Sequence, residues 1–391
     1  MSSVISYTLH NCQRCLKCLQ VCPTQAIVKQ HDRVQIKHKN CINCGRCIQM
    51  CHNQGLHAKG STLNDIENYD YSAVLIPSSI YGLCRNIDDV RHLYGALRQL
   101  GFEEIVDLSD IEGALLNKAV DLAQNSDELV ILSKCSSTVG LIEQQYPMLY
   151  NQVLWLNDAP EIAARRLRKK HADQHIGIFL LCECAAHLAE AKYPYGKKDS
   201  EVDHALSVVD LFPKISAMKE FFPEDVQLCP QGLISSSVQL MKEHLPSWVM
   251  IPHGHEQLTA ALELAEFNQL FDYKMMIPLS CFNGCLGGRL LWGNPFSSES
   301  SVVHLLNSAN KSCAELSEEE WFLQAPEIKR DNGGSFKERI HRFNRLNEIM
   351  EQLPGFNCGA CGFANCRVMA EEIFEGTKTI HDCKISEAMK G

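Results

Sequence analysis

Short apolar runs alternate with amphipathic stretches through the middle of the chain. Four runs have the length of a buried strand: YSAVLIP (71–77), ELVILSK (128–134), IGIFLL (176–181) and KMMIPLS (274–280). Between them lie stretches with helical spacing, such as DDVRHLYGALRQLG (88–101) and AELSEEEWFLQ (314–324). This alternation predicts an α/β class, with a central domain of parallel sheets flanked by helices.

The two ends of the chain follow other patterns. Near the start, the weak strands AIVKQ (26–30) and RVQIK (33–37) surround a predicted turn at His31-Asp32. Near the end, KERIHRFNRLNEIMEQL (337–353) predicts a connector helix with a charged, solvated face. With a short polar linker near KGSTLND, these changes predict three domains, at residues 1–60, 61–335 and 336–391.

The composition is that of an ordinary globular protein. The 391 residues are 45% hydrophobic and 21% charged, with a formal net charge of −10. This charge argues against nucleic acid as a partner. Because the sequence shows neither a signal segment nor an apolar run of about 18 residues, we expect a cytoplasmic protein without a transmembrane segment.

Cysteine usage changes this picture. The chain has 20 cysteines, of which eight fall within residues 12–51 and four within 358–383. In a protein expected to stay in the cytoplasm, thiols are kept reduced, so metal binding is a stronger reading than a disulfide framework.

The N-terminal cysteines form two runs of the same spacing. CQRCLKCLQVCP (12–23) and CINCGRCIQMCH (41–52) both read C-x2-C-x2-C-x3-C, in which the fourth cysteine ligates the cluster of the other run. Zinc is the alternative, since Cys-x2-Cys pairs also suit tetrahedral zinc. The predicted ligands of the first cluster are Cys12, Cys15, Cys18 and Cys51, and those of the second are Cys41, Cys44, Cys47 and Cys22.

This segment resembles a bacterial two-cluster ferredoxin. The second run departs from that pattern in having His52 where proline is usual, and it keeps all of its cysteines. The resemblance implies a small α+β domain with two 4Fe-4S clusters, and the two weak strands fit the pseudo-twofold halves of such a domain.

The C-terminal cysteines have a different spacing. Residues 353–383 contain Cys358-x2-Cys361-x4-Cys366-x16-Cys383, with glycines that let the backbone bend tightly and a helical stretch, RVMAEEIFEG, that returns the chain to the last thiolate. Zinc again remains an alternative, because four cysteines do not name the metal. The motif is similar to the small, helical single-cluster domain of corrinoid iron–sulfur proteins and membrane electron-transfer subunits, which implies a 4Fe-4S cluster.

Three of the predicted central strands are followed by cysteines. Cys135 follows the second strand, Cys182 and Cys184 follow the third, and Cys281 and Cys285 follow the fourth. Ligands of open α/β sheets bind beyond the carboxyl ends of the strands, so four of these thiols can converge on a further 4Fe-4S cluster. The alternative for each is a buried core cysteine.

Residues 71–295 resemble the catalytic domain of iron-only (FeFe) hydrogenases. KCSSTVGLIEQQYP (134–147) and LSCFNGCLGG (279–288) are similar to the first and third cysteine motifs of that family. The resemblance implies that Cys135, Cys281 and Cys285 bind a 4Fe-4S cluster and that Cys285 also bridges to a two-iron subsite with carbonyl and cyanide ligands.

The second motif of that family matches FLLCECAAHLAEA (179–191). The family has lysine at the third position after its ligand cysteine and glutamate at the sixth. Counting from Cys184 gives His187 and Glu190, whereas counting from Cys182 gives alanine and leucine. The resemblance therefore implies that Cys184 is the ligand and that Cys182 is not.

The surroundings of the two-iron subsite depart from the family. Lys134 replaces the proton-relaying cysteine, His187 replaces the lysine that holds a cyanide, and Glu183 stands where the family has an uncharged residue. Leu279 replaces a methionine, and Ala159 lacks a hydroxyl that the family uses. Buried anionic ligands need fixed donors, so these changes predict loss of the two-iron subsite. Lys134, His187 and Glu190 are the candidates for any remaining catalysis.

Three functions are consistent with these residues. The first is a hydrogenase-like electron carrier or redox or H2 sensor with four 4Fe-4S clusters, and the second is a divergent FeFe hydrogenase that interconverts H2 and protons. The third is a role in iron–sulfur assembly, against which the C-terminal cluster motif counts.

We expect redox proteins as partners (a ferredoxin, a flavoprotein or hydrogenase subunits) within a hetero-oligomeric complex. Four loaded clusters would carry the net charge from −10 to about −18, which favours basic partner surfaces.

Overall fold

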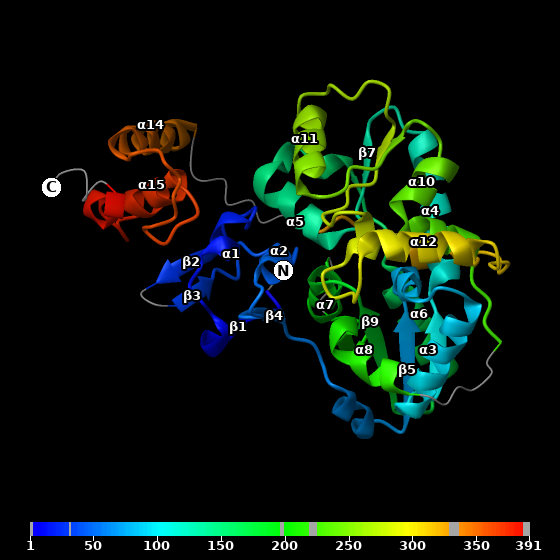
Figure 1. The fold of residues 1–391 in the computed structure, drawn as a ribbon. Coiled ribbons are helices and arrows are strands. Elements are labelled where there is room, and N and C mark those ends of the chain that lie inside the picture. Colours follow the sequence, from blue (N-terminus) through cyan, green and yellow to red (C-terminus); the bar gives the residue numbers. More distant parts are fainter. Residues whose placement is uncertain (1–2, 31–32, 196–198, 219–224, 328–335, 386–391) are drawn as a thin grey trace. The chain divides into compact units, whose positions relative to one another are not determined.

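The computed structural model describes residues 3–30, 33–195, 199–218, 225–327 and 336–385 (Figure 1). The chain divides into two compact units. The first unit is built mainly from residues 58–326, and the second combines residues 2–41 and 45–57 with residues 327–391. The segments expected as separate terminal domains therefore both contribute to the second unit.

Two parallel sheets form the frame of the first unit. One sheet has the strand order β10-β9-β5-β6, and the other has the order β11-β12-β7-β8. Every pairing within these sheets is parallel, which confirms the predicted fold class. The strands are β5 (Tyr71–Ile76), β6 (Glu104–Asp107), β7 (Val130–Leu132), β8 (Val153–Leu154), β9 (Ile176–Cys182), β10 (His204–Ser207), β11 (Val249–Met250) and β12 (Met275–Met276).

Helices surround these sheets, as Figure 1 shows for β5 and β9. The α-helices of the first unit are α3 (Ile87–Gln99), α4 (Ser109–Gln124), α5 (Ser136–Gln145), α6 (Ala159–Lys170), α7 (Ala185–Lys192), α8 (Val208–Ala217), α9 (Pro230–Ser236), α10 (Val238–His244), α11 (His255–Glu266), α12 (Pro295–Leu306) and α13 (Glu318–Trp321). Short 3-10 helices occupy Leu9–Asn11, Leu63–Asn68, Ser78–Leu83, Pro147–Gln152, Gly284–Gly287 and Ile380–Asp382. In the described part of the chain, no helix is long and apolar enough to cross a bilayer.

Local sequence explains the clearest of these elements. Helix α3 begins where the Asn86 side chain accepts the backbone N–H groups of Asp88 and Asp89, and its apolar face buries Val90 and Leu97. Strand β5 is buried along nearly all of its length, which suits a central strand covered on both faces. Strand β5 lies within the segment predicted for it, and α3 begins one residue before its predicted segment.

One expectation for the first unit needs correction. The stretch AELSEEEWFLQ, predicted as a helix, forms a single turn at Glu318–Trp321. Its carboxyl end bonds elsewhere, because the Trp321 carbonyl accepts the N–H of Asn157. The predicted linker near KGSTLND runs into an ordered 3-10 helix, where Thr62 and Asp65 form a capping box at the start of Leu63–Asn68.

The N-terminal part of the second unit has a repeated backbone. Its elements are β1 (Ile5–Tyr7), α1 (Lys17–Gln20), β2 (Ile27–Gln30), β3 (Arg33–Ile36), α2 (Arg46–Met50) and β4 (Leu56–Ala58). Positive φ angles at Arg14, Leu16 and Gln25 recur 29 residues later at Asn43, Gly45 and Gln54. Strands β2 and β3 pair antiparallel as predicted, and the predicted turn at His31-Asp32 lies outside the described residues. The repeat fits the pseudo-twofold halves expected from the sequence.

The C-terminal part of the second unit consists of α14 (Phe336–Gln352) and α15 (Cys366–Phe374), which confirms both predicted helices. It packs on β2. Ile27 of that strand belongs to the core of the N-terminal part, whereas its neighbour Val28 belongs to the core around α14 and α15. The Lys29 N–H donates to the Gly362 carbonyl at 2.8 Å, so a strand from one end of the chain is completed by a loop from the other.

Candidate metal centres and the central cavity

The predicted ligands of the first N-terminal cluster lie together. Burial and the neighbouring thiolates of Cys15, Cys51 and Cys12 raise the pKa of Cys18 to about 12. Four thiols at such close range repel one another once ionised, and a bound cation relieves that repulsion. Their arrangement therefore fits a metal cluster held by one cysteine from the second run and three from the first.

Backbone amides point at the sulfur atoms of this part of the chain. The Ala26 N–H donates to Cys22 Sγ at 3.2 Å, and the Gly55 N–H donates to Cys51 Sγ at 3.1 Å. These are equivalent positions of the two runs, and Cys22 and Cys51 are the cysteines expected to cross over. Such donors stabilise the thiolate form that a cluster requires.

The four C-terminal cysteines line one small cavity. Cys358, Cys361, Cys366 and Cys383 all contribute to its wall. Burial and the thiolates of Cys383 and Cys358 raise the pKa of Cys361. The backbone around it turns through positive φ at Gly355, Gly359 and Gly362, as the sequence predicted. This donor set fits a 4Fe-4S cluster, and those four cysteines would hold it.

The central cysteines follow three different strands that belong to both sheets of the first unit. Cys135 precedes α5 after β7, Cys184 precedes α7 after β9, and Cys281 and Cys285 follow β12. Burial raises the pKa of Cys281 to about 11, and the Cys135 thiolate adds to this effect. The pKa of Cys184 is also raised by burial, by Glu183 and by the thiolates of Cys281 and Cys285. The structure thus brings together the four thiols that were predicted to converge.

Cys182 and Cys184 have different environments. Cys182 is the last residue of β9, is fully buried, and points its thiol at the Leu180 carbonyl. Cys184 begins α7, where its sulfur accepts the His187 N–H at 3.4 Å. Cys182 therefore lies within the sheet, and Cys184 shares its surroundings with the other three thiols.

A buried ion pair lies beside Cys184. The His187 Nδ1 lies 2.8 Å from Glu183 Oε1, and the Glu183 side chain is 1% exposed. Burial disfavours both charges, yet each partner stabilises the other, so the pKa of Glu183 is lowered and the pKa of His187 is raised to about 10. The histidine that replaces the family lysine is thus held by a carboxylate of this chain.

The third cysteine motif packs directly on this pair. A methyl group at Gly288 would lie 2.5 Å from the Glu183 carbonyl oxygen and 2.9 Å from its side chain. The Leu290 N–H donates to the same carbonyl at 2.8 Å. The absence of a side chain at Gly288 is therefore what allows Glu183 to occupy its buried position.

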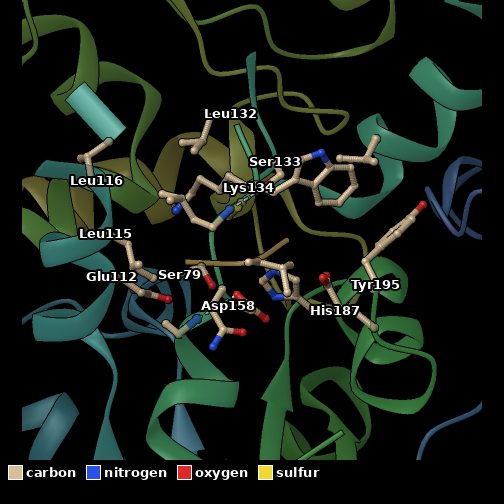
Figure 2. Close-up of a pocket in the computed structure, with 18 of the residues that line it drawn as sticks. Ser79, Glu112, Leu115, Leu116, Leu132, Ser133, Lys134, Asp158, His187 and Tyr195 are labelled. Atoms are coloured by element: carbon tan, nitrogen blue, oxygen red, sulfur yellow. Dashed lines mark hydrogen bonds between the residues drawn. The ribbon is translucent and has the colours of Figure 1, made fainter. Parts of the chain in front are cut away.

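A cavity of about 90 Å³ opens between these elements (Figure 2). Among the predicted catalytic candidates, Lys134, His187 and Glu190 all line it. The Lys134 Nζ lies 3.5 Å from Ser235 Oγ. Sequence reasoning missed several other lining residues because they come from distant segments, namely Ser79, Glu112, Trp155, Asp158, Tyr195 and Leu323.

Two carboxyl groups of this cavity are hard to ionise. Burial raises the pKa of Glu112 to about 7, although the Lys134 charge and the Ser78 N–H oppose it. Burial and the charge of Asp158 raise the pKa of Glu190 to about 8. Lys134 and the carboxyl groups therefore face one another across a water-poor space.

The same cavity contains two polar atoms without a hydrogen-bond partner among the described residues. These are the Ser79 hydroxyl oxygen and the Trp155 indole nitrogen, both from buried side chains. Buried groups of this kind are costly unless a water molecule or a ligand satisfies them. Ala159, by contrast, is the buried first residue of α6 and supplies no hydroxyl.

Three family models match separate parts of this chain. Residues 5–52 match the 4Fe-4S dicluster domain, and residues 353–385 match an Fe-S cluster model. Residues 79–232 match the iron only hydrogenase large subunit, C-terminal domain. The cysteine-rich ends are thus iron–sulfur segments, and the residues of the central match include Cys135, Cys182 and Cys184.

Curated relatives share only a short stretch with this chain. An uncharacterized protein of Methanocaldococcus jannaschii is 47% identical over 38 residues, which are 10% of this chain and 17% of that protein. A component of an ion-translocating oxidoreductase complex of Rhodobacter capsulatus is also 47% identical over 38 residues, 10% of this chain and 20% of that component. The chain therefore spans a fifth or less of the length of these relatives.

Among solved structures, a variant of the FeFe-hydrogenase HydA1 from Chlamydomonas reinhardtii matches with a TM-score of 0.49 at 13% identity, over 66% of this chain and 90% of that chain. A structure from a study of FeFe-hydrogenase inactivation by oxygen matches with a TM-score of 0.49 at 13% identity, over 64% and 89%. Taken with the family models and the parallel sheets, the cysteine sets identify the chain as a divergent hydrogenase-like protein with iron–sulfur segments at both ends.

Proposed function

We propose that this chain is a multi-cluster iron–sulfur subunit for electron transfer or for redox or H2 sensing, and that its hydrogenase-like domain lacks a working two-iron subsite. The three cysteine groups supply donors for four 4Fe-4S clusters. The predicted ligands in the central group are Cys135, Cys184, Cys281 and Cys285.

The buried pair of Glu183 and His187 carries this proposal. A two-iron subsite with cyanide ligands is anionic and needs free hydrogen-bond donors in a dry pocket. In this chain the Nδ1–H of His187 donates to Glu183, which leaves only its Nε2–H for a ligand, and the buried Glu183 carboxylate offsets the positive charge of the ring. Both effects oppose an anionic group at this position.

The carboxyl groups of the cavity act in the same direction. Among the described residues that line it, Glu112, Asp158 and Glu190 share the cavity with one lysine, Lys134, and the raised pKa values of Glu112 and Glu190 show that further negative charge is disfavoured there. Lys134 is a proton carrier in place of a cysteine, and its charge already lowers the pKa of Glu112 and Glu183. The pocket is therefore less suited to hold anionic ligands than one with an unengaged lysine would be.

A second candidate is a divergent but active FeFe hydrogenase that uses ferredoxin for reversible H2 oxidation. One observation favours it: Ser79 and Trp155 present donors to the cavity that no described residue satisfies. Such donors could bond to ligands of a metal subsite. They are also consistent with ordered water, which is why this function stands second.

Infrared spectroscopy on protein produced together with the hydrogenase maturation machinery distinguishes the two functions. We expect no carbonyl or cyanide stretching bands, together with about 16 iron atoms per chain for four clusters. Bands from those ligands would overturn the proposal and establish the second candidate. About 12 iron atoms without the bands would remove the central cluster from the proposal.

Redox proteins remain the proposed partners, within a hetero-oligomeric complex. Support comes from the short match to a component of an ion-translocating oxidoreductase complex and from the dicluster segment. Loaded clusters would add negative charge to a chain whose formal net charge is −10, so basic docking surfaces are expected on those partners.

A further inference from the structure

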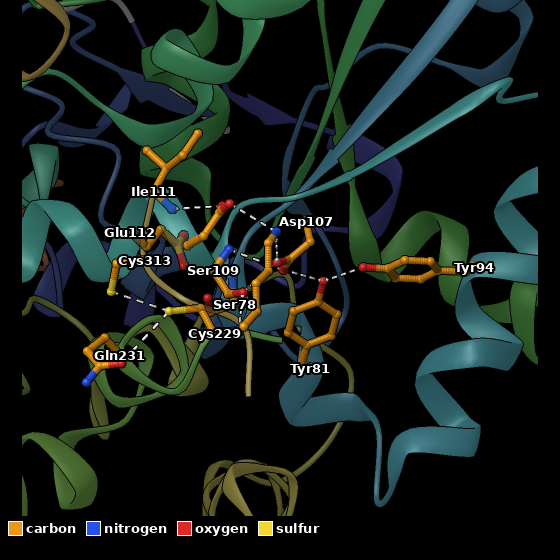
Figure 3. A network of polar contacts seen from close by, with 12 residues as sticks. Ser78, Tyr81, Tyr94, Asp107, Ser109, Ile111, Glu112, Cys229, Gln231 and Cys313 are labelled. Atoms are coloured by element: carbon orange, nitrogen blue, oxygen red, sulfur yellow. Dashed lines mark hydrogen bonds and ion pairs between the residues drawn. The ribbon is translucent and has the colours of Figure 1, made fainter. Parts of the chain in front are cut away.

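Two cysteines outside the predicted cluster sites lie in contact. The sulfur atoms of Cys229 and Cys313 are 3.5 Å apart, although 84 positions separate them in the sequence. Cys229 precedes α9, and Cys313 lies in the coil between α12 and α13. Figure 3 shows the Cys229 thiol between Cys313 and Gln231.

Hydrogen bonds hold both chain segments in place next to the thiols, one directly between the two segments and two to the start of α4. The Lys311 N–H donates to the Leu228 carbonyl at 3.0 Å, and the Ala314 N–H donates to the Asp110 carbonyl at 3.1 Å. The Cys229 N–H donates to Ser109 Oγ at 2.8 Å. Because both backbones are anchored next to sulfur atoms that are 3.5 Å apart, the step that remains is a closer approach of the two sulfur atoms, to about 2 Å.

Helix α4 closes the third side of this pair. A methyl group at Gly113 would lie 3.1 Å from Cys313 Sγ and 2.7 Å from the Gln231 side chain. The Asn117 amide donates to Cys313 Sγ at 3.7 Å. The pair is therefore enclosed by α4 and α9 of the first unit, and none of the described residues named here as its neighbours is a predicted cluster ligand.

We propose that Cys229 and Cys313 form a reversible disulfide, with a low-molecular-weight disulfide as the oxidant. Cys313 is partly exposed, so its thiolate attacks one sulfur of the oxidant and releases one small thiol. Cys229, which is 0% exposed, then attacks Cys313 and releases the second small thiol. The two cysteines lose two protons and two electrons, and the oxidant becomes two thiols.

The environment sets the conditions for this reaction. Burial and the contact with Cys229 raise the pKa of Cys313 to about 12, so the thiol form dominates at neutral pH. Oxidation of the pair is therefore slow at neutral pH. Below that pKa the thiolate fraction grows about tenfold per pH unit, and the rate of oxidation should grow with it.

The disulfide would fix residues 311–323, which we call the strap. The strap starts at the cysteine pair and ends at Leu323, which lines the central cavity. Along the way Glu320 is 2.7 Å from Arg166 Nε, and its carbonyl accepts the Asn157 side chain. A disulfide at the start of the strap would reduce its local opening and so the access to the cavity from that side.

Peptide mapping of the full-length, cluster-loaded protein tests the proposal. Its readout is a cross-linked peptide, which does not depend on the number or the activity of the clusters. The protein is incubated without oxygen with oxidised glutathione at pH 8.5, then denatured in an alkylating reagent, digested and analysed by mass spectrometry. We expect a cross-linked peptide pair containing Cys229 and Cys313 that dithiothreitol separates. Cys229→Ser and Cys313→Ser should lose it, and the matched control Cys84→Ser should keep it.

Two results would overturn the proposal. One is glutathione retained on Cys313 as a mixed disulfide, and the other is unmodified Cys229 and Cys313 after prolonged incubation at pH 9. Hydrogen exchange tests the strap separately: amides of residues 311–323 should exchange about tenfold more slowly in the oxidised protein. Unchanged exchange in a cross-linked sample would refute the effect on the strap.

Discussion

The N-terminal and central cysteine sites use the same ligand atom in two contrasting ways. In the N-terminal part, the cysteines lie in short loops and single-turn helices whose backbone repeats after 29 residues. In the central site, Cys135, Cys184, Cys281 and Cys285 come from the ends of three strands, beside a buried ion pair. The first site depends on local spacing, whereas the second depends on the whole fold.

This difference changes what a departure from the family pattern does in each site. Around the N-terminal cysteines, the change of a usual proline to His52 leaves the donor set untouched. Around the central cysteines, Glu183 and His187 add a mutually stabilising ion pair. It fills the space beside Cys184 and uses the Nδ1–H of His187 as a donor. A change in a tertiary site can therefore keep the cluster ligands and alter the chemistry next to them.

The largest effect is expected from removal of a central ligand. Cys184→Ala should lower the iron content from about 16 to about 12 atoms per chain, because three thiolates hold a 4Fe-4S cluster poorly. Cys182→Ala is the matched control, since that thiol points at the Leu180 carbonyl, and it should keep all of its iron. Iron analysis with electron paramagnetic resonance measures both, and the reverse outcome would exchange the roles of the two cysteines.

A pH-dependent effect is expected at Glu112 of the central cavity. Its folded pKa of about 7 lies above the ordinary value of 4.5, so the folded state binds more protons and loses stability as pH rises from 4.5 through 7. Glu112→Gln removes that cost, which reaches about 3 kcal/mol above pH 7. Its melting temperature should exceed that of the unmodified protein at pH 8 and match it near pH 4.5.

The exposed residue Glu128 provides the control for this experiment. Glu128→Gln should leave the difference between melting temperatures at the two pH values unchanged, because its carboxylate stays in water. A Glu112→Gln protein that behaves like this control would contradict the assignment of Glu112 to a water-poor cavity.

The smallest effect is expected from substitution of one glycine in each region. Gly288→Ala places a methyl group 2.5 Å from the Glu183 carbonyl and should cost about 1–3 kcal/mol of stability. Gly55→Ala meets its nearest atoms, from Cys12 and Cys51, at 3.5 Å, which is ordinary contact. Thermal melts should show a lower transition for the first variant alone, and equal losses would mean that the two regions are packed equally tightly.

Sequence patterns predicted the fold well where the signal is local. The strand segments at 71–77 and 176–181 and the helix at 88–101 match β5, β9 and α3 to within a residue or two at each end. The helix predicted over 314–324 failed for a tertiary reason, because the Trp321 carbonyl bonds to Asn157 rather than to a further turn. Strand order and sheet membership also depend on long-range pairing, which spacing does not encode.

For the sites, the ligand types were visible and their neighbours were not. The alignment with the hydrogenase motifs pointed to both His187 and Glu183 as departures from the family, yet it did not predict the ion pair that joins them across four positions. Ser79, Glu112 and Trp155 reach the cavity from remote segments, and the contact between Cys229 and Cys313 spans 84 positions. None of these leaves a periodic or motif-like trace in the sequence.

The hydrogen bond between Lys29 and Gly362 has a consequence for the folding of this protein during its synthesis. The second unit combines segments that precede and follow residues 58–326, so its Val28 face must wait for residues synthesised much later. At about 5–20 residues per second, the ribosome needs on the order of 10–50 s for that interval. During translation, the apolar face of β2 is therefore exposed, and chaperones or the cluster-delivery machinery have that period in which to reach the N-terminal cysteines.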